Sequence, residues 1–339
     1  MEFKQNQSLA ELTTFKIGGP ALYFVEVHDE KEVIEALEFA KQKNIPVLVL
    51  GNGSNILVSD GGFKGLVIAN KIKFLQIGDN GFMTIGAGEN WDDVVKQSVE
   101  KNLGGIECLS GIPGSAGGAV VQNIGAYGQT LSDVIKNIKA VEVASGAVKI
   151  FSLKECEFEY RNSRFKKNLN KYVVVAFELQ LNPHAKPATN YAHVQKHFQN
   201  KSNPSLQQLR DFIIQIRASK GYLIMPGFES YKTAGSFFKN PIVSIEQFDK
   251  LKPILGNSDS NRFWELPNGV KIAAAFLMQE AGFGKGYREG SVGISPKHSL
   301  SIVNFGNASA FDIKAFAEKI KSVVFQKFSV KLEEEVLYV

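Results

Sequence analysis

Residues 104–128 read GGIECLSGIPGSAGGAVVQNIGAYG and form the most informative stretch of the chain, because they are dense in glycine. Glycine has no Cβ, so a glycine-rich loop can adopt backbone angles closed to other residues and bring main-chain N–H groups close to a ligand's phosphates. The stretch therefore predicts a loop that cradles a phosphate-bearing cofactor.

Two shorter glycine clusters do not fit the common nucleotide-binding motifs. The first, GNG at 51–53, has Ile56 where the dinucleotide fingerprint needs its third glycine, and it runs into Leu57-Val58 instead of opening a helix. The second, GAG at 86–88, has Trp91 at that place. The sequence contains no Gly-Lys-Ser/Thr, which excludes a P-loop. Taken alone, each short cluster indicates a tight turn between strands.

Composition and charge narrow the class of protein. With 339 residues, 44% of them hydrophobic, the chain can bury a large core and divide into two or three domains. A net charge of +5 is far from the concentrated basic stripe of a dedicated nucleic-acid binder, and anionic small molecules fit it equally well. The polar N-terminus and the lack of an apolar run of about 18 residues predict a cytoplasmic protein without membrane insertion.

Cysteine and histidine usage predicts no metal site. Two cysteines, Cys108 and Cys156, are too few for a disulfide framework or a four-cysteine zinc site, and both are expected to be small buried hydrophobes. Among the five histidines, His193 and His197 are four residues apart, but no acidic ligand lies between them.

Strand and helix signals alternate along the chain, which predicts an α/β or an α+β fold. We expect strands at 21–27, 47–50, 82–86, 135–143, 147–151, 172–181 and 330–339, and helices at 29–44, 91–102, from Pro204, 244–255, 270–281 and 309–328. A shift to Pro, Asn, His and Lys over 182–203 indicates a linker.

Motifs in a fixed order then identify a family. These are GNGSN at 51–55, GIPGSAGG with QNIGAYG over 111–128, YRNS at 160–163, AGSFFKNP at 234–241 and LEEEV at 332–336. Over almost its whole length the chain closely resembles the UDP-N-acetylenolpyruvoylglucosamine reductases, also called UDP-N-acetylmuramate dehydrogenases. The glycine run alone would indicate only the wider vanillyl-alcohol-oxidase-like superfamily of FAD-binding proteins.

The resemblance implies an α+β architecture and a reaction. A two-subdomain FAD-binding module of the vanillyl-alcohol-oxidase type would comprise 1–70, with the C-terminal strand 329–339, and 71–203; an α+β substrate-binding domain would follow at 204–328. The family uses FAD to carry hydride from NADPH to the enolpyruvyl group of UDP-N-acetylglucosamine-enolpyruvate, giving UDP-N-acetylmuramate for bacterial peptidoglycan synthesis. The FAD segment has no histidine that could attach the flavin, so we expect FAD to be bound non-covalently.

The reaction needs fixed positive charge and a proton donor, because hydride addition to the vinyl carbon leaves negative charge on its neighbour and the carboxylate. By resemblance, Arg161 holds that carboxylate, Ser236 gives the proton and Glu335 assists the enol intermediate. Glu335 is chosen among 333–335 because the family's residue directly precedes an apolar residue, here Val336. Without the resemblance, a surface arginine, a turn serine and a solvated glutamate run are the alternatives.

The resemblance also implies binding residues. For the cofactor these are Gly51, Asn52, Gly53, Ser54, Asn55, Gly111, Ile112, Pro113, Gly114, Ser115, Gly118, Asn123, Gly125 and Tyr127. For the UDP-sugar they are Tyr191, in a loop at 187–191, with Lys220, Lys239, Asn240 and Glu280. Glu280 corresponds to a position that is Gln in some relatives, and Lys220 could instead be a cation at a helix C-terminus.

Two other functions stay open at this point. A flavin-dependent sugar or alcohol oxidase of the same superfamily would share the glycine run but has no reason to retain the motifs of Arg161, Ser236 and Glu335. A non-enzymatic anion or nucleic-acid binding module would use only the net positive charge. The lack of a second dinucleotide motif predicts that NADPH and the UDP-sugar use one pocket in turn, with ping-pong kinetics. We expect a monomer.

Overall fold

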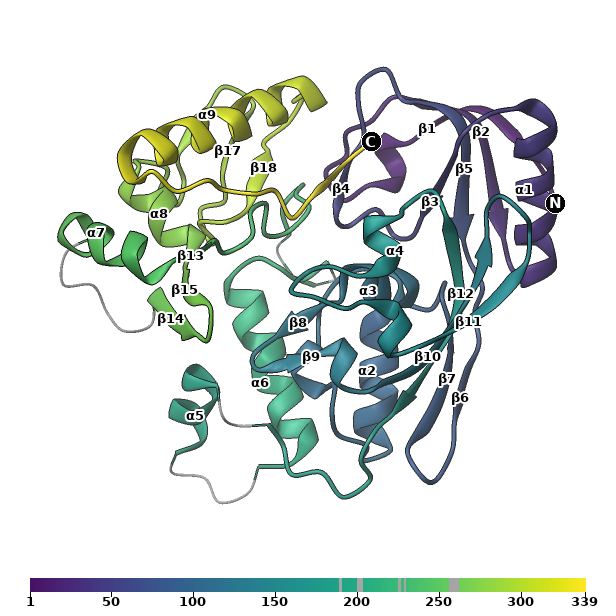
Figure 1. Cartoon of the computed structure of the whole chain (residues 1–339), viewed down its shortest axis with the longest axis horizontal. Helices are drawn as coiled ribbons and strands as arrows, with labels where there is room; N and C mark the ends of the chain where they lie inside the picture. The colour runs from purple at the N-terminus through teal and green to yellow at the C-terminus, as the bar shows by residue number, and fades with distance from the viewer. Residues whose placement is uncertain (189–190, 200–203, 225–226, 229, 256–261) are drawn as a thin grey trace. The chain divides into compact units, whose positions relative to one another are not determined.

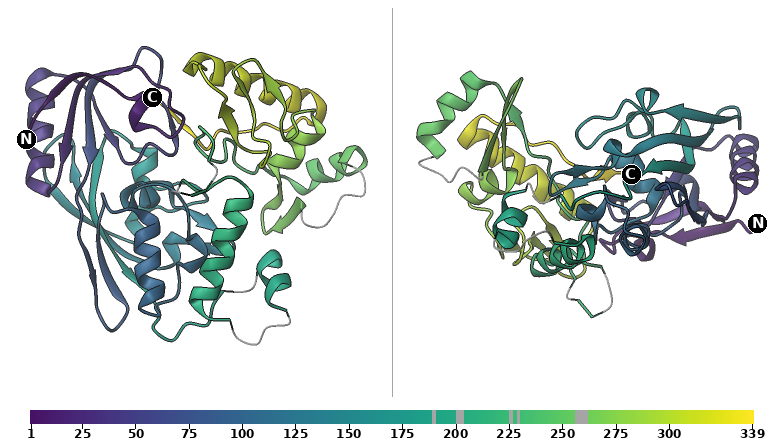
Figure 2. Two further views of the ribbon diagram at one scale, coloured as in Figure 1. Left: turned by 180° about the vertical axis from the view of Figure 1, so that it is seen from behind. Right: turned by 90° about the horizontal axis from the view of Figure 1, so that it is seen from below.

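The computed structural model describes residues 1–188, 191–199, 204–224, 227–228, 230–255 and 262–339, which form two compact units (Figure 1). Unit 1 comprises Met1–Ser8, Pro20–Gly53 and Phe63–Ser230; unit 2 comprises Leu9–Gly19, Ser54–Gly62 and Tyr231–Val339. Figure 2 shows both from two further sides. Both units mix helices with strands, which confirms the α+β prediction.

The first sheet of unit 1 has the order β1 (Lys4–Ser8), β2 (Pro20–Val27), β5 (Phe63–Asn70), β3 (Val47–Leu50). The strand β5 runs parallel to both β2 and β3, whereas β1 is antiparallel to β2. Helix α1 (Glu30–Lys43) packs against β2 and β5 and is capped by Asp29, whose side chain accepts a hydrogen bond from the Glu32 N–H at 2.8 Å. These elements include the strands and helix expected between residues 21 and 50.

The second sheet of unit 1 is antiparallel. Its order is β11 (Val148–Ser152), β10 (Ile135–Glu142), β12 (Tyr172–Gln180), β7 (Phe82–Gly86), β6 (Leu75–Ile77). Its core includes the fully buried side chains of Ile85, Trp91 and Phe177. The remaining elements of unit 1 are α2 (Trp91–Glu100), η2 (Glu107–Leu109), α3 (Ala116–Gln122), β8 (Gly125–Ala126), β9 (Gln129–Thr130), η3 (Leu131–Asp133), η4 (Lys154–Cys156), α4 (Arg164–Lys167), α5 (Ala192–Phe198) and α6 (Leu206–Ser219).

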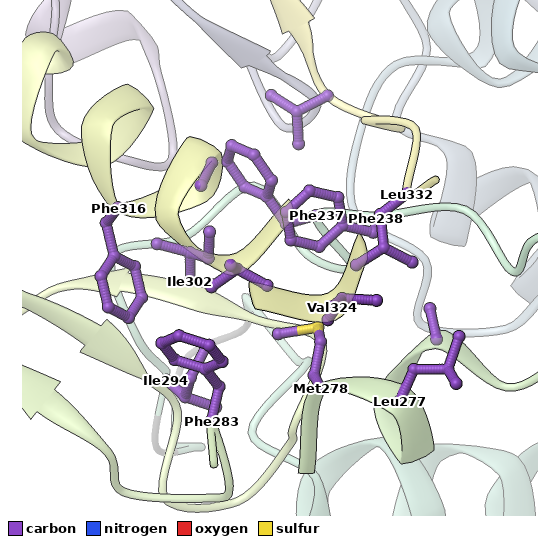
Figure 3. Close-up of a cluster of buried hydrophobic side chains, with 14 of the residues drawn as sticks. Phe237, Phe238, Leu277, Met278, Phe283, Ile294, Ile302, Phe316, Val324 and Leu332 are labelled. Carbon is purple, nitrogen blue, oxygen red and sulfur yellow. The ribbon is translucent and has the colours of Figure 1, made fainter. Parts of the chain in front are cut away.

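In its described residues, unit 2 has two three-stranded sheets and a two-stranded one. Their orders are β13 (Ile242–Val243), β15 (Gly269–Ile272), β14 (Phe263–Leu266); β16 (Arg288–Glu289), β17 (Val292–Ile294), β18 (Ile302–Asn304); and β19 (Leu337–Tyr338) parallel to β4 (Ile56–Leu57). The helices are η1 (Ala10–Leu12), α7 (Ile245–Leu255), α8 (Ala274–Glu280) and α9 (Ala310–Phe328). Figure 3 shows the core of this unit, where Phe237 and Phe238 lie among Met278, Ile302 and Val324.

The structure corrects three expectations about elements. Residues 270–281 are not one helix: β15 pairs with strands on both sides, and α8 begins only at Ala274, so strand pairing decides the conformation of the apolar stretch. Within 330–339 only β19 is a regular strand. Helix α6 is capped by Ser205 in a capping box with Gln208, so Pro204 precedes the helix.

Three helices differ from the sequence prediction, namely α3, α4 and α5. Helix α5 lies within the stretch 182–203 that was expected to be a linker, and its Val194 and Phe198 are buried together with Leu209 and Ile213.

The glycine run contains α3, which begins after Ser115 and buries Ala116, Ala119 and Val120. Glycine is a poor helix former, so local preference argues against this helix and the burial of its apolar side chains stabilises it. Within the described residues, no helix combines the length and apolar character needed to cross a bilayer.

Candidate functional site

The glycine loop that precedes α3 needs glycine at two of its positions. Gly111 has φ +69° and Gly114 has φ +137°, which are values that residues with a Cβ rarely adopt. The helix that follows is capped by Ser115, whose Oγ accepts a hydrogen bond from the Gly118 N–H at 3.2 Å. The loop is thus followed directly by the N-terminus of a short, largely buried helix.

The loop at 51–53 lies directly against this one. A Cβ at Gly51 would stand 2.3 Å from the Ser115 Oγ, which is far inside van der Waals contact. The contact joins two loops that the sequence assigned separately to one cofactor. Backbone-lined surfaces of this kind bind phosphates through N–H groups, so the residues present fit the diphosphate of FAD.

Gly111 is bonded to two charged residues, one of them paired with a third, and the sequence analysis identifies none of the three. Its N–H donates to Asp92 Oδ1 at 2.5 Å, and its carbonyl oxygen accepts from Arg217 Nε at 2.9 Å. Two hydrogen bonds of 2.7 Å join Asp92 to Arg210. Burial alone would raise the pKa of Asp92, but the hydrogen bonds from Arg210 and Gly111 outweigh it and lower that pKa. In the sequence these residues look like ordinary charged positions on two amphipathic helices.

The segment after α3 brings Arg161 beside the predicted cofactor residues. Its Nη2 donates to the Gly125 carbonyl at 2.6 Å, and Arg161 itself has φ +55°, an unusual value for a residue with a Cβ. Asn123 ends α3 in a left-handed conformation, and its side chain bonds to Glu159 O at 3.0 Å and the Ser132 N–H at 3.1 Å. The turn that carries Arg161 is therefore fastened to the glycine-rich segment.

Tyr127, Tyr191 and Lys220 form a second cluster in unit 1. The rings of Tyr127 and Tyr191 meet edge to face with centroids 5.5 Å apart, and Lys220 Nζ lies 5.9 Å from the Tyr127 ring centroid. Lys220 is the C-cap of α6, as the helix-terminus alternative expected. Burial raises the pKa of both tyrosines, so they stay protonated hydrogen-bond donors. Residues 189 and 190 of the predicted loop lie outside the described part of the chain.

In unit 2, Ser236 and Glu335 lie on neighbouring antiparallel segments. The Glu335 N–H donates to Phe237 O at 2.8 Å, and the Lys239 N–H donates to Glu333 O at 2.9 Å. Both phenylalanines that follow Ser236 are buried in the core (Figure 3), which fixes the segment. Asn55, a predicted cofactor residue, donates from Nδ2 to Glu335 O at 3.2 Å.

The three consecutive glutamates have different surroundings. Glu334 accepts from Lys321 Nζ at 2.8 Å, whereas the Glu333 side chain is 76% exposed and lies 3.5 Å from Lys239 Nζ. The Glu335 residue is half-buried, with its backbone bonded to Phe237 and Asn55. Of the three, Glu335 is the one whose N–H bonds to Phe237, the residue that follows Ser236.

The other predicted substrate residues of unit 2 have structural partners. Asn240 Oδ1 accepts from the Ala274 N–H at 3.0 Å, at the start of α8. Glu280 ends that helix as an exposed residue, and its carbonyl oxygen accepts from Lys327 Nζ. Within the part of the chain that the structure describes, Glu280 makes no hydrogen bond or ion pair with Ser236 or Glu335.

Among the described residues, the two cysteines are not reactive thiols and no side-chain cluster forms a metal site. Both thiols are buried, and burial raises the pKa of Cys108 and of Cys156 to about 12, so each stays protonated. Across the residues that the structure describes, no group of three His, Cys, Asp or Glu side chains could hold a metal ion.

Comparisons with known proteins find the same family of reductases over nearly the whole chain. An FAD binding domain model matches residues 21–152, and a model of the UDP-N-acetylenolpyruvoylglucosamine reductase C-terminal domain matches 228–339. The reductase of Thermobifida fusca is 36% identical over 98% of this chain and 97% of its own; that of Streptomyces coelicolor is 37% identical over 96% and 88%.

A solved structure supports the same assignment. The UDP-N-acetylenolpyruvylglucosamine reductase of Thermus caldophilus superposes with a TM-score of 0.67 and 26% identity, over 99% of this chain and 98% of that one. At this coverage and identity, the likeness extends to the full length of both chains. The chain therefore belongs to the UDP-N-acetylenolpyruvoylglucosamine reductase family.

Proposed function

We propose that this protein reduces the enolpyruvyl group of UDP-N-acetylglucosamine-enolpyruvate with NADPH and forms UDP-N-acetylmuramate for peptidoglycan synthesis. The observation that carries the proposal is the pairing of the Ser236 segment with the Glu335 segment in a chain of this family. A sugar or alcohol oxidase would need neither the serine nor the glutamate at these places.

The cofactor is FAD, bound non-covalently. The residues that would hold it are those of the adjoining loops at 51–53 and 111–115, with Asn55, Gly118, Asn123, Gly125 and Tyr127. The chemistry that FAD supplies when bound is acceptance of a hydride from NADPH and its transfer to the terminal vinyl carbon of the substrate.

Arg161 and Glu335 stabilise the charge that hydride addition creates. The Arg161 guanidinium is permanently positive and offers two parallel donors to the substrate carboxylate, on which the enolate charge is shared. The hydrogen bond from the Arg161 side chain to the Gly125 carbonyl oxygen restricts the orientation of that side chain before the substrate arrives. Glu335 assists the enol form.

Ser236 gives the proton that completes the reduction. A serine hydroxyl is a very weak acid, but a carbanion-like enolate is a strong enough base to take its proton when the geometry is held. The geometry is held because Phe237 and Phe238 are buried and the main chain of Phe237 is bonded to Glu335. The proton goes to the carbon next to the carboxylate.

The UDP-sugar is bound by cationic and aromatic side chains. Lys220 supplies charge for the diphosphate, and Tyr191 covers it from the neighbouring segment. Lys239, Asn240 and Glu280 are the contacts that we assign to unit 2. We also infer that the protein is a cytoplasmic monomer in which NADPH and the UDP-sugar alternate in one pocket; a ternary complex of both ligands would contradict this.

The direct test is product analysis in heavy water. With NADPH and the enolpyruvyl substrate, mass spectrometry should find the reduced product with deuterium on the carbon next to the carboxylate. Deuterium is also expected on the former vinyl carbon, to the extent that the hydrogen held by the reduced flavin exchanges with water before its transfer. Consumption of oxygen with a sugar alone would favour the oxidase instead. A colourless protein whose binding to RNA falls steeply with salt would favour the nucleic-acid binding module.

A further inference from the structure

Both main-chain polar groups of Gly111, its N–H and its carbonyl oxygen, form hydrogen bonds to charged side chains. Its N–H donates to Asp92 and its carbonyl accepts from Arg217, at 2.5 and 2.9 Å. The N–H and C=O groups of a trans peptide point in opposite directions. The Arg217 contact therefore turns the N–H of Ile112 away from Arg217, and the orientation of the loop 111–115 follows from these two bonds.

The acceptor for the Gly111 N–H is itself fixed. Asp92 and Arg210 form a forked ion pair, and their side chains are only 14% and 8% exposed. Two apolar side chains could hold helices α2 and α6 together equally well, because desolvation cancels much of what a buried ion pair gains. Two apolar side chains could not accept the hydrogen bond from the Gly111 N–H. The buried ion pair therefore fixes the position of Gly111 in addition to joining the two helices.

Gly111 packs closely against side chains of α6 and the residues after it. A Cβ at Gly111 would stand 2.7 Å from Leu223 Cδ2 and 2.9 Å from Ile214 Cδ1. The absence of a side chain at Gly111 therefore allows the close approach in which Arg217 bonds to its carbonyl oxygen. Helix α6 ends at Lys220, which lies against Tyr127. The same helix therefore carries both Arg217, which bonds to the loop, and a predicted substrate residue.

We propose that Asp92, Arg210 and Arg217 are positioning residues that hold Gly111–Ser115 in the shape that binds the diphosphate of FAD. They act through the Gly111 backbone and lie outside the motifs that identify the family. The proposal rests on the proposed function, because it requires that FAD is the cofactor. It predicts that cofactor affinity depends on side chains that need not touch the cofactor.

The test measures FAD affinity separately from stability. Apoprotein is titrated with FAD by quenching of flavin fluorescence, well below the melting temperature that circular dichroism gives for the same apoprotein. Arg217→Met, which keeps the aliphatic stem, should raise the Kd for FAD about tenfold, because a hydrogen bond from a charged donor is lost. Asp92→Asn should raise it about threefold, because the fork with Arg210 is broken. Asp93→Asn makes the same charge change at the adjacent, exposed position and should leave the Kd unchanged.

The outcomes distinguish the possible roles. A lower melting temperature with an unchanged Kd in Arg217→Met would show a purely structural role and overturn the inference. If that variant does not fold, Asp92→Ala replaces it, because it removes the acceptor of the Gly111 N–H, and a wild-type Kd there overturns the inference equally. Failure of the wild-type protein to bind FAD would instead refute the proposed function.

Discussion

At the residue scale, the candidate chemistry depends on a few side chains whose neighbours are unusual for their type. Arg161 has a left-handed backbone and is tied to a glycine carbonyl, and Ser236 precedes two buried phenylalanines. Surface arginines and turn serines do not normally have such restricted settings. These restrictions make specific predictions possible.

The Ser236→Ala variant should separate the two halves of the reaction. Flavin reduction by NADPH should stay at the wild-type rate, because it needs no proton from Ser236. Reoxidation by the enolpyruvyl substrate should slow by about 100-fold or more in stopped-flow absorbance, the usual loss for a general acid. The control is Ser322→Ala, which changes an exposed serine on α9. Unchanged reoxidation would remove Ser236 from the proton-donor role.

Arg161→Lys should lower kcat while the protein keeps its charge. An ammonium loses both the two parallel donors to the carboxylate and the bond to the Gly125 carbonyl. We expect a loss of about tenfold or more in steady-state turnover, since a charged hydrogen bond is removed from the transition state. Arg164→Lys, three residues away on a partly exposed side chain, is the matched control. Wild-type turnover in Arg161→Lys would count against its assignment.

Asp92 should make a pH-dependent contribution to stability. Its pKa in the folded protein is below the ordinary value of 3.8, so the stabilisation is complete above that value and is lost as the pH falls through the folded pKa. The free energy of unfolding of the wild type should therefore exceed that of Asp92→Asn near neutral pH, and the difference should shrink in acid. Urea titrations across the acidic range measure it. A difference that stays constant with pH would show that Asp92 titrates alike in both states.

At the element scale, the fold positions the site by bringing separate loops and segments together. Local signals predicted many elements: Asp29 caps α1, Ser309 caps α9, and β-branched residues bounded by turns indicate β12. They failed for β15, where pairing with two strands overrides an apolar run, and for α3, where burial overrides glycine. In both cases contacts outside the segment itself, with β13 and β14 for β15 and with the core of unit 1 for α3, outweigh the local preference.

The contact of the two glycine loops gives an element-scale prediction. Gly51→Ala places a methyl group 2.3 Å from the Ser115 Oγ, so one loop must move. We expect weaker FAD binding by about tenfold in the same fluorescence titration, a loss comparable to the usual strain of overpacking. Gly61→Ala is the control, because its Cβ would have no atom within 4 Å. Equal FAD affinity in both variants would show that the loops can separate without cost.

At the scale of the whole molecule, sequence motifs predicted the family and the catalytic candidates but not their physical support. Arg161, Ser236 and Glu335 could be named because they lie in recognisable motifs. The sequence could not identify Asp92, Arg210 and Arg217. Their buried ion pair and the hydrogen bond to the Gly111 carbonyl form only when α2, α6 and the loop come together in the fold. Such contacts leave no spacing pattern in the sequence.

The central claim is that a bound flavin carries hydride from NADPH to the enolpyruvyl substrate. The most direct measurement is the visible spectrum of the anaerobic holoprotein, recorded after NADPH and again after UDP-N-acetylglucosamine-enolpyruvate. We predict that NADPH bleaches the yellow absorbance and that the substrate restores it, with one equivalent of UDP-N-acetylmuramate formed. A bleached flavin that only oxygen can restore would contradict the account.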